Sequence, residues 1–324
     1  MLIAAATILV GFIILIWSAD LFVAGAASIA ENLGLSPVII GLTIVSLGTS
    51  APEILVSLTA ALAGAGDLAI GNAIGSNIAN IGLVLGVTVL VAPLCVHPSC
   101  MRVEMPTLLV VTVGVGALML DGVLSRLDGI LMASALVIIL VQMIRTQARD
   151  ETLLEEAVDE PLPHLNPAKA WLTFAFGLIL LIASSRLLVW GATDIALRLG
   201  VSQLVIGLTI VAVGTSLPEL AATVASALRG HTEIAVGNVI GSNLFNLLAV
   251  MPIPALFSSM PLAPEVLTRD YAMMSIATLM LAGAVLIGRL RKAAPAGHSY
   301  VGRSVGCLLV TFYAAYYYLL YITI

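Results

Sequence analysis

A forty-residue segment occurs twice in this chain at one constant spacing. Residues 41–80 and 207–246 align without a gap at an offset of 166, and 21 of the 40 positions are identical. Both copies carry the motif G-T-S-x-P-E followed by G-N-x-x-G-S-N-x-x-N, embedded in apolar sequence. Each copy thereby brings one glutamate, Glu53 or Glu219, into a hydrophobic segment, where a charged side chain is costly and usually functional. The duplication predicts one polar site that is built from two halves of the chain.

The composition is that of a polytopic membrane protein. Of the 324 residues, 60% are hydrophobic and only 10% are charged, whereas soluble domains contain about 25% charged residues. An apolar helix of about 20 residues spans a bilayer. The first apolar stretch lacks the basic flank of a signal peptide, so we expect it to be a spanning helix. Ten such stretches are predicted, at 2–28, 37–63, 68–93, 104–121, 127–146, 169–197, 203–228, 233–258, 267–288 and 302–322.

One long hydrophilic segment divides the chain into two halves. We predict a first five-helix repeat at 1–147, an acidic cytoplasmic linker at 148–167 and a second five-helix repeat at 168–324. A duplicated unit with an odd number of spans inserts its two copies in opposite orientations, and substrates of such proteins bind near the membrane midplane between the copies. The predicted fold class is an all-α polytopic membrane protein with ten transmembrane helices as two inverted five-helix repeats.

Basic residues predict the orientation in the membrane. With the N-terminus outside, nine lysines and arginines fall in cytoplasmic loops and three in external loops, and cytoplasmic loops are the ones enriched in these residues. We therefore expect an integral protein of the cell (inner) membrane, with both termini outside and the central linker in the cytoplasm.

The first motif contains the elements of a cation site. Pro52 has no N–H, so the carbonyl of Gly48 loses its helical partner, and a bare carbonyl at membrane depth must face protein, water or an ion. Thr49 and Ser50 lie four and three residues before Glu53, so the three side chains share one helix face. Carboxylate, hydroxyl and carbonyl oxygens favour Ca²⁺, Na⁺ or Mg²⁺ over zinc or copper.

The second motif adds a polar stripe to an apolar helix. Asn72, Ser76 and Asn80 are spaced four apart, and the same three residue types recur 166 residues later. Gly71 and Gly75 are expected to let another helix approach closely.

Packing is the alternative interpretation for these polar residues, because small and polar side chains often only join membrane helices. For Asn77 and Asn243, packing and a binding role are equally compatible with the sequence. It does not account for Glu53 and Glu219, because a buried carboxylate without a partner would simply take up a proton. Packing is favoured for Thr43, Ser46, Ser57, Thr59 and Thr209.

The paired motifs resemble the α-repeats of the cation/Ca²⁺ antiporter superfamily, and in particular prokaryotic sodium/calcium exchanger-like inner-membrane proteins. The resemblance covers essentially the whole chain. It implies ten helices, alternating access, and cation ligation by helices two, three, seven and eight. Carried onto matching positions, it implies a ligand set of Thr49, Ser50, Glu53, Ser76, Asn80, Thr215, Ser216, Glu219, Ser242 and Asn246.

The resemblance implies a secondary active antiporter that exchanges Na⁺ for Ca²⁺, with an exchanger of H⁺ for Ca²⁺ or another divalent cation as the alternative. Asn80 and Asn246 stand where some members, including potassium-dependent ones, have aspartate, which argues against potassium dependence. The expected partners are Ca²⁺, Na⁺ and the lipid bilayer. We expect no cofactor, nucleic acid or obligate protein partner.

Other functions are less compatible with the sequence. We expect no enzyme, because the four histidines fall in predicted loops and no nucleophile and base lie together at membrane depth. The cysteines Cys95, Cys100 and Cys307 form no metal pattern, and free thiols are favoured over a Cys95–Cys100 disulfide. Asp20 and Arg186 occupy equivalent repeat positions, and we weigh an ion pair between them against separate contacts with the membrane interface.

Overall fold

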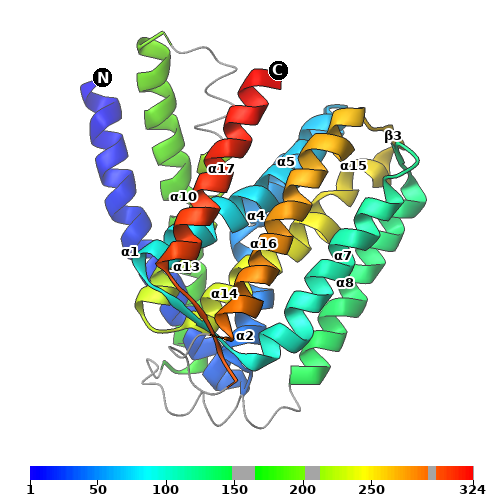
Figure 1. The fold of residues 1–324 in the computed structure, drawn as a ribbon. Helices are drawn as coiled ribbons and strands as arrows, with labels where there is room; N and C mark the ends of the chain where they lie inside the picture. The colour runs from blue at the N-terminus through cyan, green and yellow to red at the C-terminus, as the bar shows by residue number, and fades with distance from the viewer. Residues whose placement is uncertain (148–164, 201–211, 291–296, 324) are drawn as a thin grey trace.

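The computed structural model describes residues 1–147, 165–200, 212–290 and 297–323, which form helices joined by short strands and turns (Figure 1). The elements of the first half are α1 Leu2–Leu33, α2 Pro37–Ile40, the π-helix η1 Gly41–Val45, α3 Ser46–Thr49, α4 Ala51–Leu62, α5 Gly66–Ala79, the π-helix η2 Asn80–Leu85, α6 Gly86–Val91, β1 Leu94–Val96, the π-helix η3 Cys100–Glu104, α7 Met105–Leu118, β2 Val123–Leu124 and α8 Arg126–Gln147. Those of the second half are α10 Pro167–Arg198, α12 Ala212–Thr215, α13 Leu217–Leu228, α14 Thr232–Phe245, the π-helix η5 Asn246–Val250, α15 Pro252–Phe257, β3 Met260–Pro261, the π-helix η6 Val266–Tyr271, α16 Ala272–Gly288, β4 Ser299–Val301 and α17 Arg303–Thr323.

The predicted membrane spans agree well with the helices. Eight helices of the described residues are long and apolar enough to cross a membrane, and the pair Val38–Thr49 and Ala51–Leu62, bent by 45°, passes the same test when taken together. The seventh predicted span, 203–228, begins outside the described residues, and its described part is α12 and α13. Almost all of the predicted linker 148–167 also lies outside them.

The two halves repeat the same series of elements. α4, α5 and η2 recur as α13, α14 and η5, with starting residues shifted by the 166 positions of the sequence repeat. The strands pair between the halves: β1 with β4, and β2 with β3, both antiparallel. Each half therefore supplies one strand to each of two small sheets.

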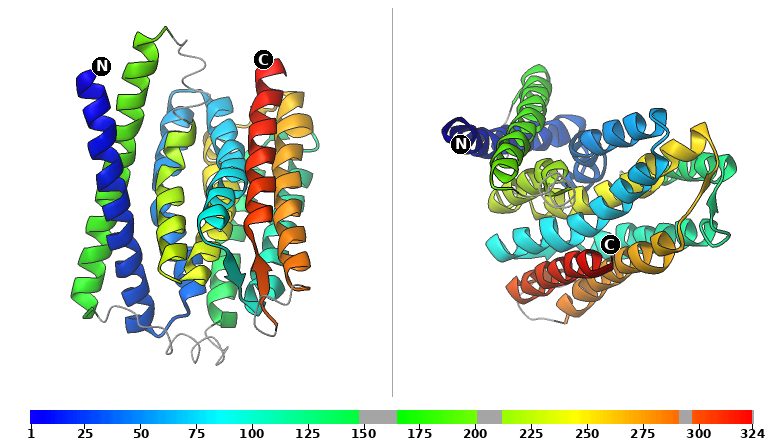
Figure 2. Two further views of the ribbon diagram at one scale, coloured as in Figure 1. Left: turned by 60° about the vertical axis from the view of Figure 1, so that its left-hand side comes forward. Right: turned by 90° about the horizontal axis from the view of Figure 1, so that it is seen from above.

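The long helices α1 and α10 cross as an antiparallel pair, standing together at one edge of the molecule (Figure 2). A Cβ added at Gly25 would lie 2.5 Å from the backbone of Phe174, and one at Gly191 would lie 2.9 Å from Ile8. Gly191 is the repeat equivalent of Gly25, and Phe174 that of Ile8. The two contacts are therefore related by a local two-fold axis. Glycine at each contact allows the two helices to approach closely.

The termini lie on one face of the molecule, together with β3 (Figure 1). Because α10 runs antiparallel to α1, its last turns return to the face of the N-terminus, and its first turn lies at the opposite face. The linker lies almost wholly outside the described residues, so the predicted orientation, with both termini outside and the linker in the cytoplasm, stays a prediction.

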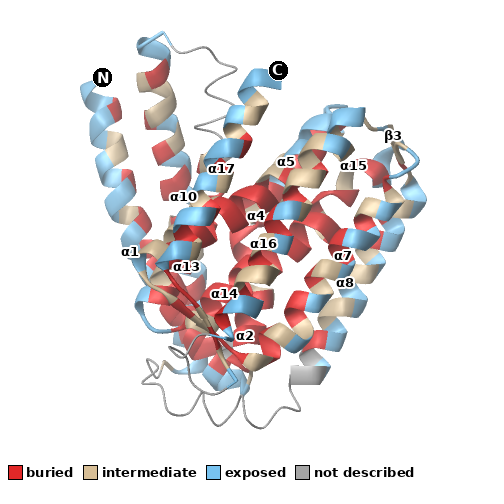
Figure 3. Cartoon of the chain, in the orientation of Figure 1, coloured by how far each residue is buried: buried red, intermediate tan, exposed pale blue. Residues whose placement is uncertain are grey.

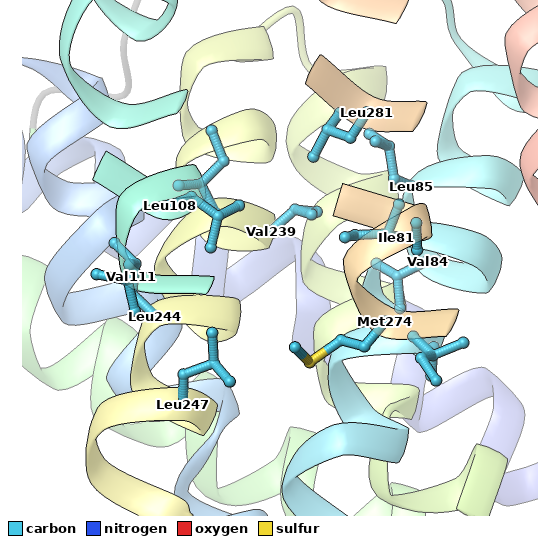
Figure 4. Close-up of a cluster of buried hydrophobic side chains, with 14 of the residues drawn as sticks. Ile81, Val84, Leu85, Leu108, Val111, Val239, Leu244, Leu247, Met274 and Leu281 are labelled. Carbon is cyan, nitrogen blue, oxygen red and sulfur yellow. The ribbon is translucent and has the colours of Figure 1, made fainter. Parts of the chain in front are cut away.

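The core surrounds the two central spans. In the most apolar stretch of each span, 72% of the residues are buried in Gly66–Val91 and 83% in Thr232–Phe257. The corresponding share is 17–39% in the outer spans. Buried residues accordingly fill the centre and exposed ones the periphery (Figure 3). Figure 4 shows the apolar contacts, in which Leu85, Val239 and Leu281 come from three different spans.

Glycines hold the two halves in direct contact at the centre. A Cβ at Gly41 would lie 2.8 Å from the carbonyl oxygen of Ile234, and one at Gly241 would lie 2.6 Å from that of Leu42. α14 therefore packs on η1 with the backbones touching. The corresponding prediction for Gly71 and Gly75 is not tested, because the segment equivalent to η1 in the second half lies outside the described residues.

Two minor predictions have clear outcomes. None of the three cysteines is in a disulfide, so the Cys95–Cys100 disulfide is not formed, as expected. The proposed Asp20–Arg186 ion pair is wrong, because Asp20 pairs with Arg229. Asp20 lies on the helix face turned toward the end of α13, and this packing was not visible in the repeat spacing.

Candidate cation site

Two interrupted helices meet at the centre of the molecule. The backbone leaves helical geometry at Ser50 (φ −81°, ψ 3°) and at Ser216 (φ −87°, ψ 3°). α4 and α13 then begin with Pro52 and Pro218 in their first turns. The predicted break at each proline is therefore confirmed, and it creates two helix N-termini inside the protein.

The two motif glutamates occupy these helix N-termini. Glu53 lies in the first turn of α4 and Glu219 in the first turn of α13, and each is only 1% exposed. The partial positive charge of a helix N-terminus stabilises a nearby carboxylate. This arrangement offsets part of the cost of burying the two acids.

A hydrogen bond between the halves brings the two helix starts together. Ser50 Oγ donates to Glu219 Oε1 at 3.2 Å, and Ser50 lies one turn from Glu53. The two carboxylates also interact electrostatically. They therefore form one site that neither half could supply alone.

Asparagines of the second motif join the same centre. Asn80 Nδ2 donates to Asn243 Oδ1 at 3.2 Å, and Asn77 Nδ2 donates to the carbonyl oxygen of Asn243 at 3.3 Å. The π-helices η2 and η5 begin at Asn80 and Asn246. Single π-helical turns inside α-helices frequently mark functional sites, and nothing in the sequence pattern predicted them here.

The centre contains many buried polar atoms without a hydrogen-bond partner among the described residues. Buried polar groups are nearly always satisfied in folded proteins, so a cluster of exceptions indicates an ion or water that belongs there. Most of these atoms are oxygens, which is the ligand type of hard cations. The unpartnered oxygens of the two motifs are Glu53 Oε1 and Oε2, Asn77 Oδ1, Asn80 Oδ1, Ser216 Oγ, Glu219 Oε2, Ser242 Oγ and Asn246 Oδ1.

Nine of the ten predicted site residues are buried in this central region, on α3 to α5, η2, α13, α14, η5 and the two breaks. Thr215 differs, because it is half-buried at the end of α12 and lines a cavity.

A set of hydrogen bonds that the sequence did not predict orients the side chains of the site. Thr223 Oγ1 donates to the carbonyl oxygen of Glu219 at 2.6 Å and accepts from Asn238 Nδ2 at 2.8 Å. Asn238 Oδ1 in turn accepts from Thr49 Oγ1 at 3.2 Å. A hydroxyl group that gives its hydrogen to a fixed acceptor keeps its lone pairs for a cation. In the first half, Asn72 Nδ2 donates to the Glu53 carbonyl at 3.2 Å and to Ser57 Oγ at 3.3 Å.

The spacing of these residues was visible, but their partners were not. Asn72 and Asn238 belong to the predicted polar stripe, whereas the sequence favours a packing role for Ser57 and gives no signal for Thr223. The spacing predicts only on which face of a helix a residue lies. The role of the residue depends on its partner on the neighbouring helix, which the spacing does not predict.

A cavity of about 350 Å³ reaches the site from one side. Its α10 residues lie in the half of that helix nearer the face of the termini. On the site side it touches Pro52, in the first turn of α4, and Thr215, at the end of α12. Its lining is Pro52, Val56, Ile182, Ser185, Arg186, Val189, Trp190, Gly214 and Thr215.

Comparisons with known proteins agree along nearly the whole chain. The sequence model of the family described as "Sodium/calcium exchanger protein" matches residues 3–145 and 169–322. CaxA, a candidate antiporter of Alkalimonas amylolytica, is 44% identical over 99% of both chains. The inner membrane protein YrbG of Escherichia coli (strain K12) is 39% identical over 95% of this chain and 94% of its own. The structure of the sodium-calcium exchanger NCX_Mj, soaked with 2.5 mM Na⁺ and 0.1 mM Ca²⁺, matches with a TM-score of 0.80 at 31% identity, covering 97% of each chain.

Proposed function

The chain belongs to the sodium/calcium exchanger protein family, and on that premise we propose that it is a secondary antiporter that exchanges Na⁺ for Ca²⁺ at the site between its two halves. The observation that supports this most directly is the cluster of buried, unpartnered oxygens around Glu53 and Glu219. Two carboxylates that are buried beside one another repel, so a bound cation between them would stabilise both.

We assign ion ligation to the ten residues that match the family motifs. Thr49, Ser50 and Glu53 would supply one side of the site, and Ser216 and Glu219 the other. Ser76, Asn80, Ser242 and Asn246 would complete it from the central spans. Thr215 would bind from the cavity side.

The charge of the site favours competition between the two ions. Its two glutamates supply two negative charges, which one Ca²⁺ or two Na⁺ would neutralise. Because the same carboxylates would serve both ions, Na⁺ binding would displace Ca²⁺. Competition at a shared site is the minimum requirement of an antiporter.

The fold supports an alternating-access mechanism. We propose ten spans arranged as two inverted five-helix repeats, with both termini outside an inner membrane. Two observations are consistent with that arrangement. α1 and α10 cross with a local two-fold relation, and strands of one half pair with strands of the other. The cavity would then be the external access route, and movement of α1 and α10 against the core would close it.

The test is Ca²⁺ flux into sealed proteoliposomes under an outward Na⁺ gradient, a pH gradient, or neither. The variants are Glu219→Gln and Glu53→Gln. The matched control is Glu104→Gln, which makes the same change at another buried glutamate, outside the proposed ligand set.

We expect Na⁺-driven uptake in the wild type and in the Glu104 variant, and loss of at least 100-fold in either site variant, because each removes half of the site charge. Flux driven only by the pH gradient would replace Na⁺ by H⁺ as the coupling ion. Equal flux in the wild type and both site variants would refute the assigned site.

A further inference from the structure

The access cavity contains a positive charge. Arg186 lies near the middle of α10, and among the residues that the structure describes it is the one charged residue that lines this cavity. Its neighbours there include Pro52 and Thr215, which belong to the two ion-site motifs. A cation that reaches the site through this cavity must therefore pass a guanidinium group.

Arg186 is exposed, and no ion pair joins it to a carboxylate in the parts of the chain that the structure describes. A charged side chain at this depth of a membrane protein needs a counter-ion or water. The cavity beside it offers the space for that water, through which the charge would act on ions that cross the cavity.

This charge breaks the symmetry of the two halves. The repeat equivalent of Arg186 is Asp20, so the two long helices carry opposite charges at the same position. Asp20 is paired with Arg229, at the end of α13. The equivalent of Arg229 in the first half is Ala63, so the repeat gives Arg186 no charged partner that corresponds to the one of Asp20.

We propose that Arg186 is a selectivity residue of the access route, which repels divalent cations more strongly than monovalent ones on the face of the termini. This proposal rests on the proposed exchange function and adds to it a preference at one face. The energy of an ion in an electrostatic potential is proportional to its charge. If the guanidinium lowers the local concentration of Na⁺ in the cavity by a factor f, it lowers the local concentration of Ca²⁺ by the square of f.

The size of the effect follows from Coulomb's law. A unit charge roughly 7 Å away in water changes the energy of a monovalent ion by about one kT. The corresponding factor is roughly 3 for Na⁺ and roughly 7 for Ca²⁺, smaller than the roughly 10- to 1,000-fold effects of whole charged clefts on association rates, as expected for a single charge. On this face, Ca²⁺ that leaves the site would therefore bind again only slowly, while Na⁺ would still bind.

The experiment measures each face separately, in right-side-out and inverted membrane vesicles that contain the full chain. A cleavable C-terminal tag identifies the face of the termini. Na⁺-loaded vesicles give kcat/KM for external Ca²⁺, and Ca²⁺-loaded vesicles give the half-saturating external Na⁺ concentration. The variants are R186Q and R186K. The matched control is R198Q, on the same helix, because Arg198 pairs with Asp194 and does not line the cavity.

On the face of the termini, we expect R186Q to raise kcat/KM for Ca²⁺ roughly 7-fold and to lower the half-saturating Na⁺ concentration roughly 3-fold. The opposite face should not change, and R186K and R198Q should behave as the wild type. Added choline chloride should shrink the difference between R186Q and wild type, because salt screens charges.

Equal factors for Ca²⁺ and Na⁺, equal changes on both faces, or a difference that does not depend on salt would each overturn the proposal while leaving exchange intact. Absence of Na⁺-driven Ca²⁺ flux in the wild type would instead refute the proposed function, and this inference with it.

Discussion

The contact between η1 and α14 gives the sharpest structural prediction, tested by Gly241→Ala. A Cβ at this position would lie 2.5 Å from Ser46 Oγ, 2.6 Å from the carbonyl oxygen of Leu42 and 2.9 Å from the Leu42 Cα. Two of these atoms belong to the backbone, so they cannot move aside by changing a rotamer. Restoring ordinary contact distances requires the two segments to separate by roughly 0.8 Å.

Overpacking of this kind usually destabilises a protein by about 1–3 kcal/mol. Alanine's higher helix propensity would return at most about 1 kcal/mol of this. A net loss of about 1–2 kcal/mol corresponds to a fall in Tm of roughly 1–3 °C for a chain of this size. We also expect slower exchange, because the same contact holds Thr49 against Asn238.

The assay is thermal unfolding of the purified protein in detergent, followed by Na⁺-driven Ca²⁺ uptake at a temperature well below Tm. The control is Gly114→Ala, in the exposed part of α7, where no described atom lies within 4 Å of the added Cβ. Its Tm should be unchanged or higher. If Gly241→Ala had a Tm and an uptake rate equal to those of wild type, the close contact would not be present in the working protein.

Two other predictions concern hydrogen bonds and ion pairs. Thr223→Val keeps the side-chain shape but leaves the Asn238 amide without its acceptor, which costs about 1–3 kcal/mol, so we expect KM for Ca²⁺ to rise about tenfold. Thr278→Val, at a buried threonine bonded to its own helix, should leave KM unchanged, and equal KM values in both variants would contradict the role of Asn238. The Asp20–Arg229 pair has side chains that are 52% and 31% exposed, so a double-mutant cycle of Asp20→Asn and Arg229→Gln on Tm should give a coupling energy below about 1 kcal/mol. A coupling of several kcal/mol would mean that the pair is shielded from solvent.

The spans could be predicted because each depends on local sequence alone. An apolar run of sufficient length forms a membrane helix whatever surrounds it, and α5 to α6 at 66–91 begins and ends within two residues of the predicted 68–93. The helix breaks at Pro52 and Pro218 were equally local, because a missing N–H interrupts its own helix.

Partners across the interfaces could not be predicted in the same way. Repeat spacing suggested that Asp20 faces Arg186, whereas helix packing brings it to Arg229. The π-helices at Asn80 and Asn246 and the role of Thr223 are further cases, since each depends on contacts between segments distant in sequence.

The sequence by itself determined the membrane class, the duplication, the two broken helices and the acidic residues at the start of each. These features follow from hydrophobicity and backbone chemistry, which act over a few neighbouring residues. Only the tertiary structure decided that Ser50 donates to Glu219, that Asn238 holds Thr49, and that Arg186 lines the cavity leading to the site. The physical reason is that a hydrogen bond or a charge acts over a few ångströms in space, and the packing of glycine-lined helices fixes which distant residues come that close.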